Sequence, residues 1–116
     1  ARLPRLTVAG YPHHIIQRGN NRQTVFLTDA DRLSYLDTLR RKCREHSLAL
    51  LGWCLMPNHV HLVAIPAHQH SMARAIGQTH HTFALHANRL RRRSGHFWQN
   101  RFYSCPVGPS HLIEAL

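Results

Sequence analysis

Two apolar segments joined by a short turn constrain the fold of this chain more than any other feature. Residues 48–55 and 59–65 are strongly apolar, and residues 56–58 separate them. Each segment has the length of a strand, and the Pro and Asn between them are typical turn residues. Two strands joined by so short a turn pair antiparallel. The sequence therefore predicts a β-hairpin that lies within a larger sheet.

The second strand of this hairpin begins with two histidines, His59 and His61. Side chains two residues apart in a strand project from the same face, which places the two imidazoles together, about 6–7 Å apart at the backbone. Two imidazoles can hold one metal ion and leave it open to polarise a phosphodiester oxygen. His68 and His70 repeat the spacing, but they fall in a predicted loop, where we expect exposure to solvent and no ligand role.

The remaining predicted elements place this hairpin in a mixed fold. They are a strand at 11–17, a polar turn at 18–22, a helix from Thr28 to 46–47, a helix from Ser71 to 89–93, and an edge strand or extended arm at 97–107. The order is β-α-β-β-α-β. This order predicts a ferredoxin-like α+β sandwich in which helices cover one face of an antiparallel sheet and the two histidines lie on a central strand.

Both predicted helices have one apolar face. Thr28 and Ser71 are the predicted N-caps, and acidic residues follow Thr28 in the first turn, where the helix dipole favours them. The predicted apolar positions are Leu33, Leu36, Leu39 and Cys43 in the first helix, and Met72, Ala75, Thr79, Phe83, Ala87 and Leu90 in the second. His80, His81 and His86 lie on the second helix with no carboxylate nearby, and we expect them at the surface.

The charge of the chain is strongly positive and uneven. Fifteen Lys and Arg face five Asp and Glu, which gives a formal net charge of +10, and only Lys42 is a lysine. Four of the five acids lie between residues 29 and 45, and residues 46–113 contain none. Arginine binds phosphate with two parallel hydrogen bonds, so this composition favours a nucleic-acid partner. The alternative is a merely solvated surface. A membrane partner would favour lysine and an amphipathic helix.

The length of 116 residues suits one domain, residues 1–116. No apolar run approaches the ~18 residues of a membrane span, and nothing at the start has the form of a signal peptide. Cys43, Cys54 and Cys105 are odd in number and widely spaced, so a disulfide framework is not expected. We therefore expect a cytoplasmic protein.

Three basic or aromatic segments are candidate DNA contacts. They are Arg18, Asn20, Asn21 and Arg22 in the polar turn, Arg91, Arg92 and Arg93 at the end of the second helix, and Trp98, Arg101 and Tyr103 in the last segment. Arginines can meet phosphates, and exposed aromatic rings can stack on single-stranded bases. Each segment also has a structural alternative: a turn chosen for its backbone angles, cations that suit a helix C-terminus, and aromatic rings that belong to the core.

Three separated motifs carry a resemblance to a known family. Residues 56–63 (MPNHVHLV) resemble the HUH motif of single-tyrosine transposases, specifically the REP-associated tyrosine transposases and their insertion-sequence relatives. Residues 17–22 (QRGNNR) and 94–102 (SGHFWQNRF) resemble two further motifs of that family, in the same order. The resemblance extends from about residue 11 to residue 116, and it implies the same ferredoxin-like fold.

The resemblance also implies a chemistry. Such enzymes cut single-stranded DNA at hairpin-bearing sites. A tyrosine hydroxyl attacks the phosphodiester, which leaves a 5′-phosphotyrosine and a free 3′-OH. Mg²⁺ or Mn²⁺, held by the residues that correspond to His59 and His61, activates the scissile phosphate, because tyrosine with a pKa near 10 is a weak nucleophile.

The chain departs from the family pattern at the nucleophile. The family tyrosine would fall about two residues beyond Leu116, and an Asn that can serve as a third metal ligand would follow about four residues later. Tyr11, Tyr35 and Tyr103 do not match that position, and packing explains each, although Tyr103 also suits base stacking. We therefore expect the chain to be truncated before the nucleophile helix and inactive in cleavage as it stands.

Other functions remain open at this point. The main alternative is a module that binds DNA or RNA hairpins without chemistry. A zinc hydrolase is a weaker alternative, because the HxH pair has no nearby carboxylate to act as general base. The oligomeric state is also open, and a homodimer would let a tyrosine act on the partner's site.

Overall fold

The computed structural model describes residues 6–108, which form one antiparallel sheet and two long helices. In chain order the elements are β1 (His13–Arg18), the short 3₁₀ helix η1 (Asn20–Arg22), α1 (Asp29–Glu45), β2 (Leu48–Met56), β3 (His59–Pro66), α2 (Ser71–Leu90) and β4 (Tyr103–Pro106). The strand order is β2-β3-β1-β4. This is the predicted ferredoxin-like arrangement, with β1 and β3 in the centre.

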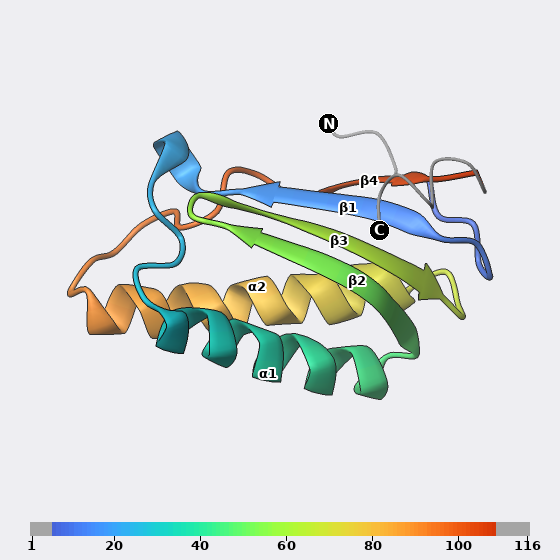
Figure 1. Cartoon of the computed structure of the whole chain (residues 1–116), viewed down its shortest axis with the longest axis horizontal. Helices are drawn as coiled ribbons and strands as arrows, with labels where there is room; N and C mark the ends of the chain where they lie inside the picture. The colour runs from blue at the N-terminus through green and yellow to red at the C-terminus, as the bar shows by residue number, and fades with distance from the viewer. Residues whose placement is uncertain (1–5, 109–116) are drawn as a thin grey trace.

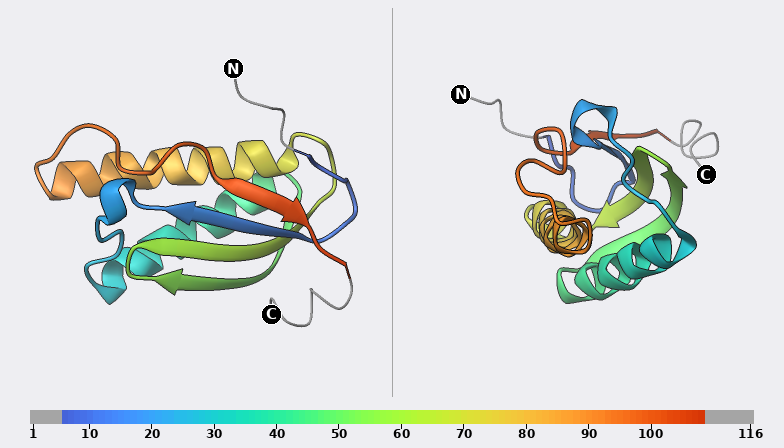
Figure 2. Two further views of the ribbon diagram at one scale, coloured as in Figure 1. Left: turned by 90° about the horizontal axis from the view of Figure 1, so that it is seen from above. Right: turned by 90° about the vertical axis from the view of Figure 1, so that its left-hand side faces the viewer.

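Both helices pack against the same face of the sheet, and no helix within residues 6–108 lies over the other face (Figures 1 and 2). Along the central strands, side chains alternate between the face that the helices cover and the other face. Ile15, Val60 and Leu62 are fully buried beneath the helices, where they meet Tyr35 from α1 and Phe83 from α2. The helix-free face is called the open face below. No helix within residues 6–108 is long and apolar enough to cross a membrane.

The predicted hairpin is confirmed, and hydrogen bonds at its turn connect it to two other segments of the chain. Met56 pairs with His59 across the β2–β3 ladder, so only Pro57 and Asn58 connect the strands. The carbonyl of Pro57 accepts hydrogen bonds from two backbone amides of the segment before α1, and the carbonyl of Asn58 accepts one from Gly19 at the end of β1. These bonds hold the first residue of β3, His59, at one end of the sheet.

The helical faces differ from the prediction at two leucines. Leu33 is 68% exposed, because α1 packs through Tyr35, Leu39 and Cys43, and residue 33 lies on the opposite side of the helix. Leu90 is 65% exposed, because the last turn of α2 extends past the end of the sheet (Figure 1). Both helices are otherwise buried along the predicted stripes.

One of the two predicted helix caps is correct. The side chain of Thr28 accepts a hydrogen bond from the amide of Asp31 at the start of α1, as expected for an N-cap. Ser71 is instead the first residue of α2, and His70 takes the cap position. The Ser71 hydroxyl accepts from the amide of His68 and so fixes the loop before the helix.

The last predicted strand is much shorter than expected. Only Tyr103–Pro106 pairs with β1, and residues 97–102 form a connection that crosses the end of β1. An isolated bridge between Gly19 and Trp98 attaches this connection to the turn after β1. The segment therefore contributes residues to the end of the sheet at which β3 begins.

Candidate metal and nucleic-acid site

His59 and His61 lie on the open face of the sheet, as the strand periodicity predicts. Both are half-buried, and their ring centroids are 4.8 Å apart. The central strand β1 pairs with β3 so that Arg18 lies opposite His59 and Ile16 opposite His61. Because directly paired residues share a face, the Arg18 guanidinium belongs to the same surface as the two imidazoles.

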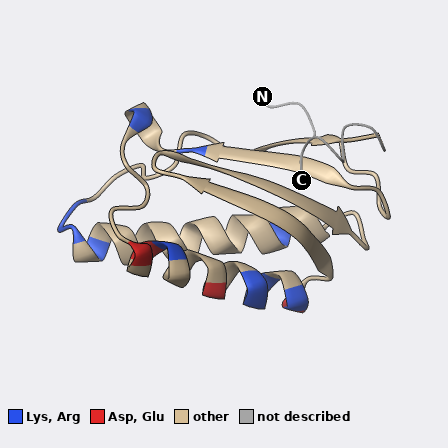
Figure 3. Ribbon diagram, viewed as in Figure 1, with Lys and Arg blue, Asp and Glu red and all other residues tan. Residues whose placement is uncertain are grey.

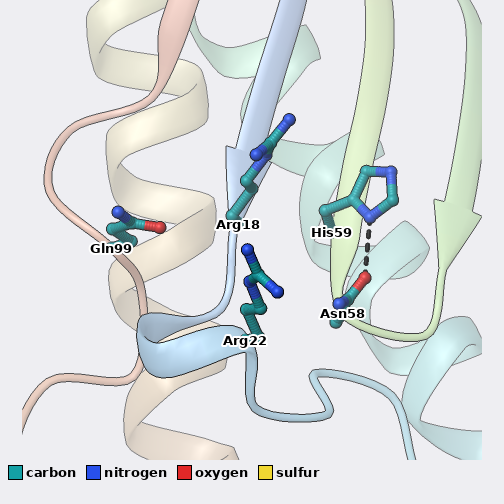
Figure 4. Close-up of a pocket in the computed structure, with 5 residues that line it drawn as sticks. All are labelled: Arg18, Arg22, Asn58, His59 and Gln99. Carbon is teal, nitrogen blue, oxygen red and sulfur yellow. Dashed lines mark hydrogen bonds between the residues drawn. The ribbon is translucent and has the colours of Figure 1, made fainter.

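The tautomer of the neutral His59 ring is set by its neighbour in the turn. His59 Nδ1 lies 2.8 Å from the side-chain oxygen of Asn58 (Figure 4). An amide oxygen can only accept, so Nδ1–H is the donor, and in the neutral ring Nε2 carries the lone pair. A metal-binding histidine typically donates its other ring N–H in this way. His59 Nε2 is thus ready to act as a metal ligand.

His61 meets a third histidine that the sequence did not single out. Its Nδ1 is 3.1 Å from His14 Nε2, and the two rings stack with centroids 5.3 Å apart. Burial lowers the pKa of His61, and the nearby charges of His59, His14 and Arg18 lower it further. The neutral imidazole, which is the form that binds metals, is therefore favoured at His61.

The two histidines fit a metal ion that takes its remaining ligands from elsewhere. Among residues 6–108, no group of three or more His, Cys, Asp or Glu side chains is arranged to hold a metal ion. Two imidazole nitrogens leave open positions for water or phosphate oxygens, which a catalytic ion requires. The donor set suits an ion that binds substrate directly, and it does not suit a closed structural site.

A cavity of about 440 Å³ opens beside His59. It is lined by Arg18, Arg22, Asn58, His59 and Gln99, as Figure 4 shows. Two guanidinium groups, two amides and an imidazole line it, and no acidic residue between positions 6 and 108 does. A second hollow extends from it along β1 toward Tyr103, and Arg18 and Gln99 line both. Arginines and amides in a groove of this kind are the groups that bind the nucleic-acid backbone.

Three segments far apart in the sequence build this cavity. The carbonyl of Asn58 binds the Gly19 amide, the Phe97 carbonyl binds the Asn20 amide, and the Arg18 carbonyl binds the Gln99 amide. A Cβ atom on Gly19 would lie 2.6 Å from the carbonyl oxygen of Gln23, so only glycine fits there. Asn21 and Arg22 then adopt left-handed φ angles of 53° and 57°, which turn the chain at η1.

The predicted nucleic-acid residues divide into three groups. Arg18 and Arg22 line the cavity, and Arg101 and the 61% exposed Tyr103 line the adjoining hollow. Four others lie outside both hollows: Asn20 and Asn21 form η1 without lining the cavity, and Arg92 and Arg93 are exposed beyond the end of α2. The sequence analysis missed His14, Asn58 and Gln99.

The predicted stacking surface at Trp98 is wrong. Trp98 is 8% exposed and Phe97 is 3% exposed, and both belong to the hydrophobic core. The Trp98 indole donates a hydrogen bond to the carbonyl of His80 and stacks on the His80 ring with centroids 4.5 Å apart. The prediction failed because residues 97–102 turn into the core and do not run along the sheet edge.

His80 was predicted at the surface, and this prediction is also wrong. The side chain is 4% exposed and lies between Trp98 and Tyr35. Its Nε2 accepts a hydrogen bond of 2.7 Å from the Tyr35 hydroxyl. Burial lowers the pKa of His80 to about 3, so the ring is neutral. His81 and His86 are exposed as expected.

Arg91 connects two segments of the fold, whereas the sequence predicted a contact with DNA. Its guanidinium donates to the carbonyls of Thr24 and Val25, pairs with Asp31 at 3.4 Å, and covers the ring of Phe97. These contacts use most of the guanidinium N–H donors, so Arg91 is not available as a DNA contact. They connect the end of α2 to the segment before α1.

We expect Arg91→Ala to lower the free energy of unfolding by about 2 kcal/mol, because it leaves two carbonyls and Asp31 without their charged partner. Chemical denaturation measures this difference. Arg92→Ala and Arg93→Ala are matched controls on exposed neighbours and should change stability by less than about 0.5 kcal/mol. A loss no larger in Arg91→Ala than in these controls would contradict the structural role.

The acidic residues are far less widely distributed than the basic ones. Within residues 6–108, all Asp and Glu side chains lie on α1, on the helix side of the sheet (Figure 3). Arg18 and Arg22 lie at the end of β1 and in η1, away from every carboxylate of the described part of the chain. The open face around His59 is therefore electropositive, as a surface for a polyanion must be.

The comparisons with known proteins agree with this architecture. The family described as "Transposase IS200 like" matches residues 7–115, so the chain belongs to the IS200-like transposases. The solved structures include a REP-associated tyrosine transposase bound to a REP hairpin, with a TM-score of 0.71 and 17% identity over 98% of this chain. This chain spans 66% of the length of that protein.

A second solved structure is that of a protein from Deinococcus radiodurans R1 that is assigned as a transposase. It has a TM-score of 0.69 and 20% identity, and the match covers 98% of this chain and 92% of the other. At such identities the two structures support the fold alone. A search of curated proteins finds no match. The family assignment and the fold predicted from the three motifs are both confirmed.

Proposed function

We propose that this transposase domain binds single-stranded DNA beside a hairpin and activates one phosphodiester of it for cleavage and rejoining. The observation that carries the proposal is the juxtaposition of Arg18 with His59 on the open face, in register across β1 and β3. One group can neutralise a phosphate, and the other can hold the ion that polarises it. The hairpin is proposed by analogy with the hairpin-bound relative of the same fold.

His59 and His61 are the residues that would hold the divalent ion, Mg²⁺ or Mn²⁺. When bound, such an ion acts as a Lewis acid on a phosphate oxygen. Side chains of the protein itself would position His59 and bind the phosphates. Asn58 accepts from His59 Nδ1 and so leaves Nε2 as the nitrogen that can ligate, and Arg18 and Arg22 would bind phosphates beside it. The two guanidinium groups would stabilise the charge that develops on the phosphate oxygens during displacement.

The displacement itself would be carried out by a tyrosine hydroxyl. Its oxygen forms a bond to phosphorus and loses its proton, while the bond from phosphorus to the 3′-oxygen breaks and that oxygen gains a proton. A 5′-phosphotyrosine and a 3′-OH result. The covalent link conserves the phosphodiester bond energy, so the same site can rejoin the strand to a new 3′-OH.

None of the described tyrosines is well placed for this role. Tyr35 is fully buried, and burial raises its pKa. Tyr11 precedes β1 at the opposite end of the sheet, where Gly10 bonds to Pro66. Tyr103 is on the open face, but a hydrogen bond with Cys105 raises its pKa and so disfavours the tyrosinate. We therefore propose a nucleophile outside residues 6–108, and a stacking role for Tyr103.

A hairpin-binding module without chemistry is the second candidate. It is favoured by one observation: the described residues supply two metal ligands, and the one tyrosine among them that lies on the open face, Tyr103, has a raised pKa. The Arg18 cavity would serve either function equally. The two candidates differ in whether a covalent protein–DNA adduct forms. The predicted cytoplasmic location and the homodimer remain predictions.

We expect Arg18→Ala to weaken binding of a hairpin with a single-stranded overhang by about tenfold and to reduce the salt dependence of binding by about one released counterion. Fluorescence anisotropy across a series of salt concentrations measures both. Arg44→Ala, on the exposed surface of α1, is the matched control and should change neither. Equal losses in the two variants would mean that the arginines act only through net charge and that the cavity is not the DNA site.

A further inference from the structure

We propose that His14 is a positioning residue that holds His61 in the tautomer and orientation needed to bind a metal ion. The inference rests on the proposed function, because it concerns the same ion. It assigns a role to a residue that none of the three motifs contains. The role would be exerted through His61 and not by contact with the DNA or the ion.

The contact between the two rings connects the two central strands. His14 belongs to β1 and His61 to β3, and the strand register places His14 opposite Val63, one residue pair away from His61 on the same face. At this diagonal position the His14 Nε2 and His61 Nδ1 atoms are 3.1 Å apart. The rings are inclined by only 29°. The stacked contact and the hydrogen bond together restrict rotation of the His61 ring.

The hydrogen bond carries a single proton, and its direction decides whether His61 can bind an ion. If His61 Nδ1–H is the donor, His61 Nε2 keeps a lone pair and can ligate. If His14 Nε2–H is the donor, the remaining proton of neutral His61 lies on Nε2 and blocks it. Metal-binding histidines usually have such a partner on the second nitrogen. In its accepting role, His14 would hold His61 in the tautomer that leaves Nε2 free to ligate.

The two predicted ligands are held by different kinds of partner. His59 donates to the amide oxygen of Asn58, which can only accept. His61 faces an imidazole, which can accept or donate. His14 is not itself a third ligand in this arrangement, because its Nε2 faces His61 and no three-residue metal group exists within residues 6–108. An apolar side chain could fill the same space but could not accept the proton.

The test compares His14→Gln with His14→Ala, using the metal-free ¹⁵N-labelled chain and Mn²⁺ as the probe. Long-range ¹H–¹⁵N spectra at neutral pH report which ring nitrogen of His61 carries the proton. We expect Nδ1–H in the wild type and in His14→Gln, because the glutamine oxygen can accept. His14→Ala should show a mixture of tautomers and should bind Mn²⁺ about 10–100-fold more weakly, while His14→Gln stays within about threefold.

His81→Ala, an exposed histidine on α2, is the matched control and should leave both readouts unchanged. Unchanged Mn²⁺ affinity and an unchanged His61 tautomer in His14→Ala would overturn the inference. Equal losses in His14→Gln and His14→Ala would also overturn it, because they would indicate packing or direct ligation. If His59→Ala and His61→Ala leave Mn²⁺ binding intact, the proposed function itself fails, and this result is distinct from a failure of His14 alone.

Discussion

Replacing His61 or His59 with alanine should weaken Mn²⁺ binding by more than about 100-fold, since loss of an outer partner alone costs about 10–100-fold. The reason is that the described residues supply only these two ligands, so each variant leaves a single imidazole. Electron paramagnetic resonance of free Mn²⁺ measures the affinity directly. The double variant should bind Mn²⁺ at most a few fold more weakly than the weaker of the two single variants, because a single imidazole already binds the ion poorly.

The chain contains its own matched control for this experiment. His68 and His70 have the same spacing but lie in the exposed loop before α2. Their alanine variants also remove two imidazoles. They should leave Mn²⁺ affinity unchanged. If the loop pair and the strand pair contribute equally, binding reflects a general excess of histidine, and the metal site on the open face is wrong.

The second large effect concerns the stability of the fold at acidic pH. His80 titrates near its ordinary pKa of 6.5 in the unfolded chain but at about 3 when folded, because its burial disfavours the charged ring. Its contribution to stability is fully present above pH 6.5. Below that pH the unfolded chain binds a proton that the folded chain does not, so stability falls by about 1.4 kcal/mol per pH unit until about pH 3.

His80→Gln isolates this contribution. The glutamine oxygen can still accept from the Tyr35 hydroxyl, but the side chain does not titrate. The difference in unfolding free energy between the wild type and His80→Gln, from denaturation at several pH values, should shift in favour of the variant as pH falls from 6.5. His81→Gln, on the exposed neighbour, should keep the wild-type profile. Parallel profiles for the wild type and His80→Gln would show that His80 is not buried as described.

The sequence predicted the local parts of this site well. The alternation in residues 59–65 was sufficient to place His59 and His61 on one face, because a strand imposes a period of two. The cap at Thr28 and the turn at 18–22 were likewise visible, since both depend on the local chemistry of a few adjacent residues. Three motifs in the right order then identified the family.

The parts that failed depend on contacts between distant segments. The partnership of His14 with His61 requires the register between β1 and β3, which no local pattern encodes. Trp98 and His80 each have polar atoms that suit a surface, yet both are buried: the Trp98 indole donates to the His80 carbonyl, and His80 Nε2 accepts from Tyr35. The role of Arg91 was missed for the same reason, because its partners precede it by more than sixty residues. Burial of polar residues is decided by partners, and partners are set by the tertiary fold.

Cleavage at this site requires that DNA and the ion meet at His61. The decisive measurement is covalent adduct formation between the protein, expressed from its full reading frame, and a hairpin oligonucleotide with a single-stranded overhang, followed on denaturing gels as Mn²⁺ is varied. We predict that the wild type forms an adduct only with the ion, and that His61→Ala forms none while still binding the hairpin. An adduct that forms at the wild-type rate in His61→Ala would contradict the account.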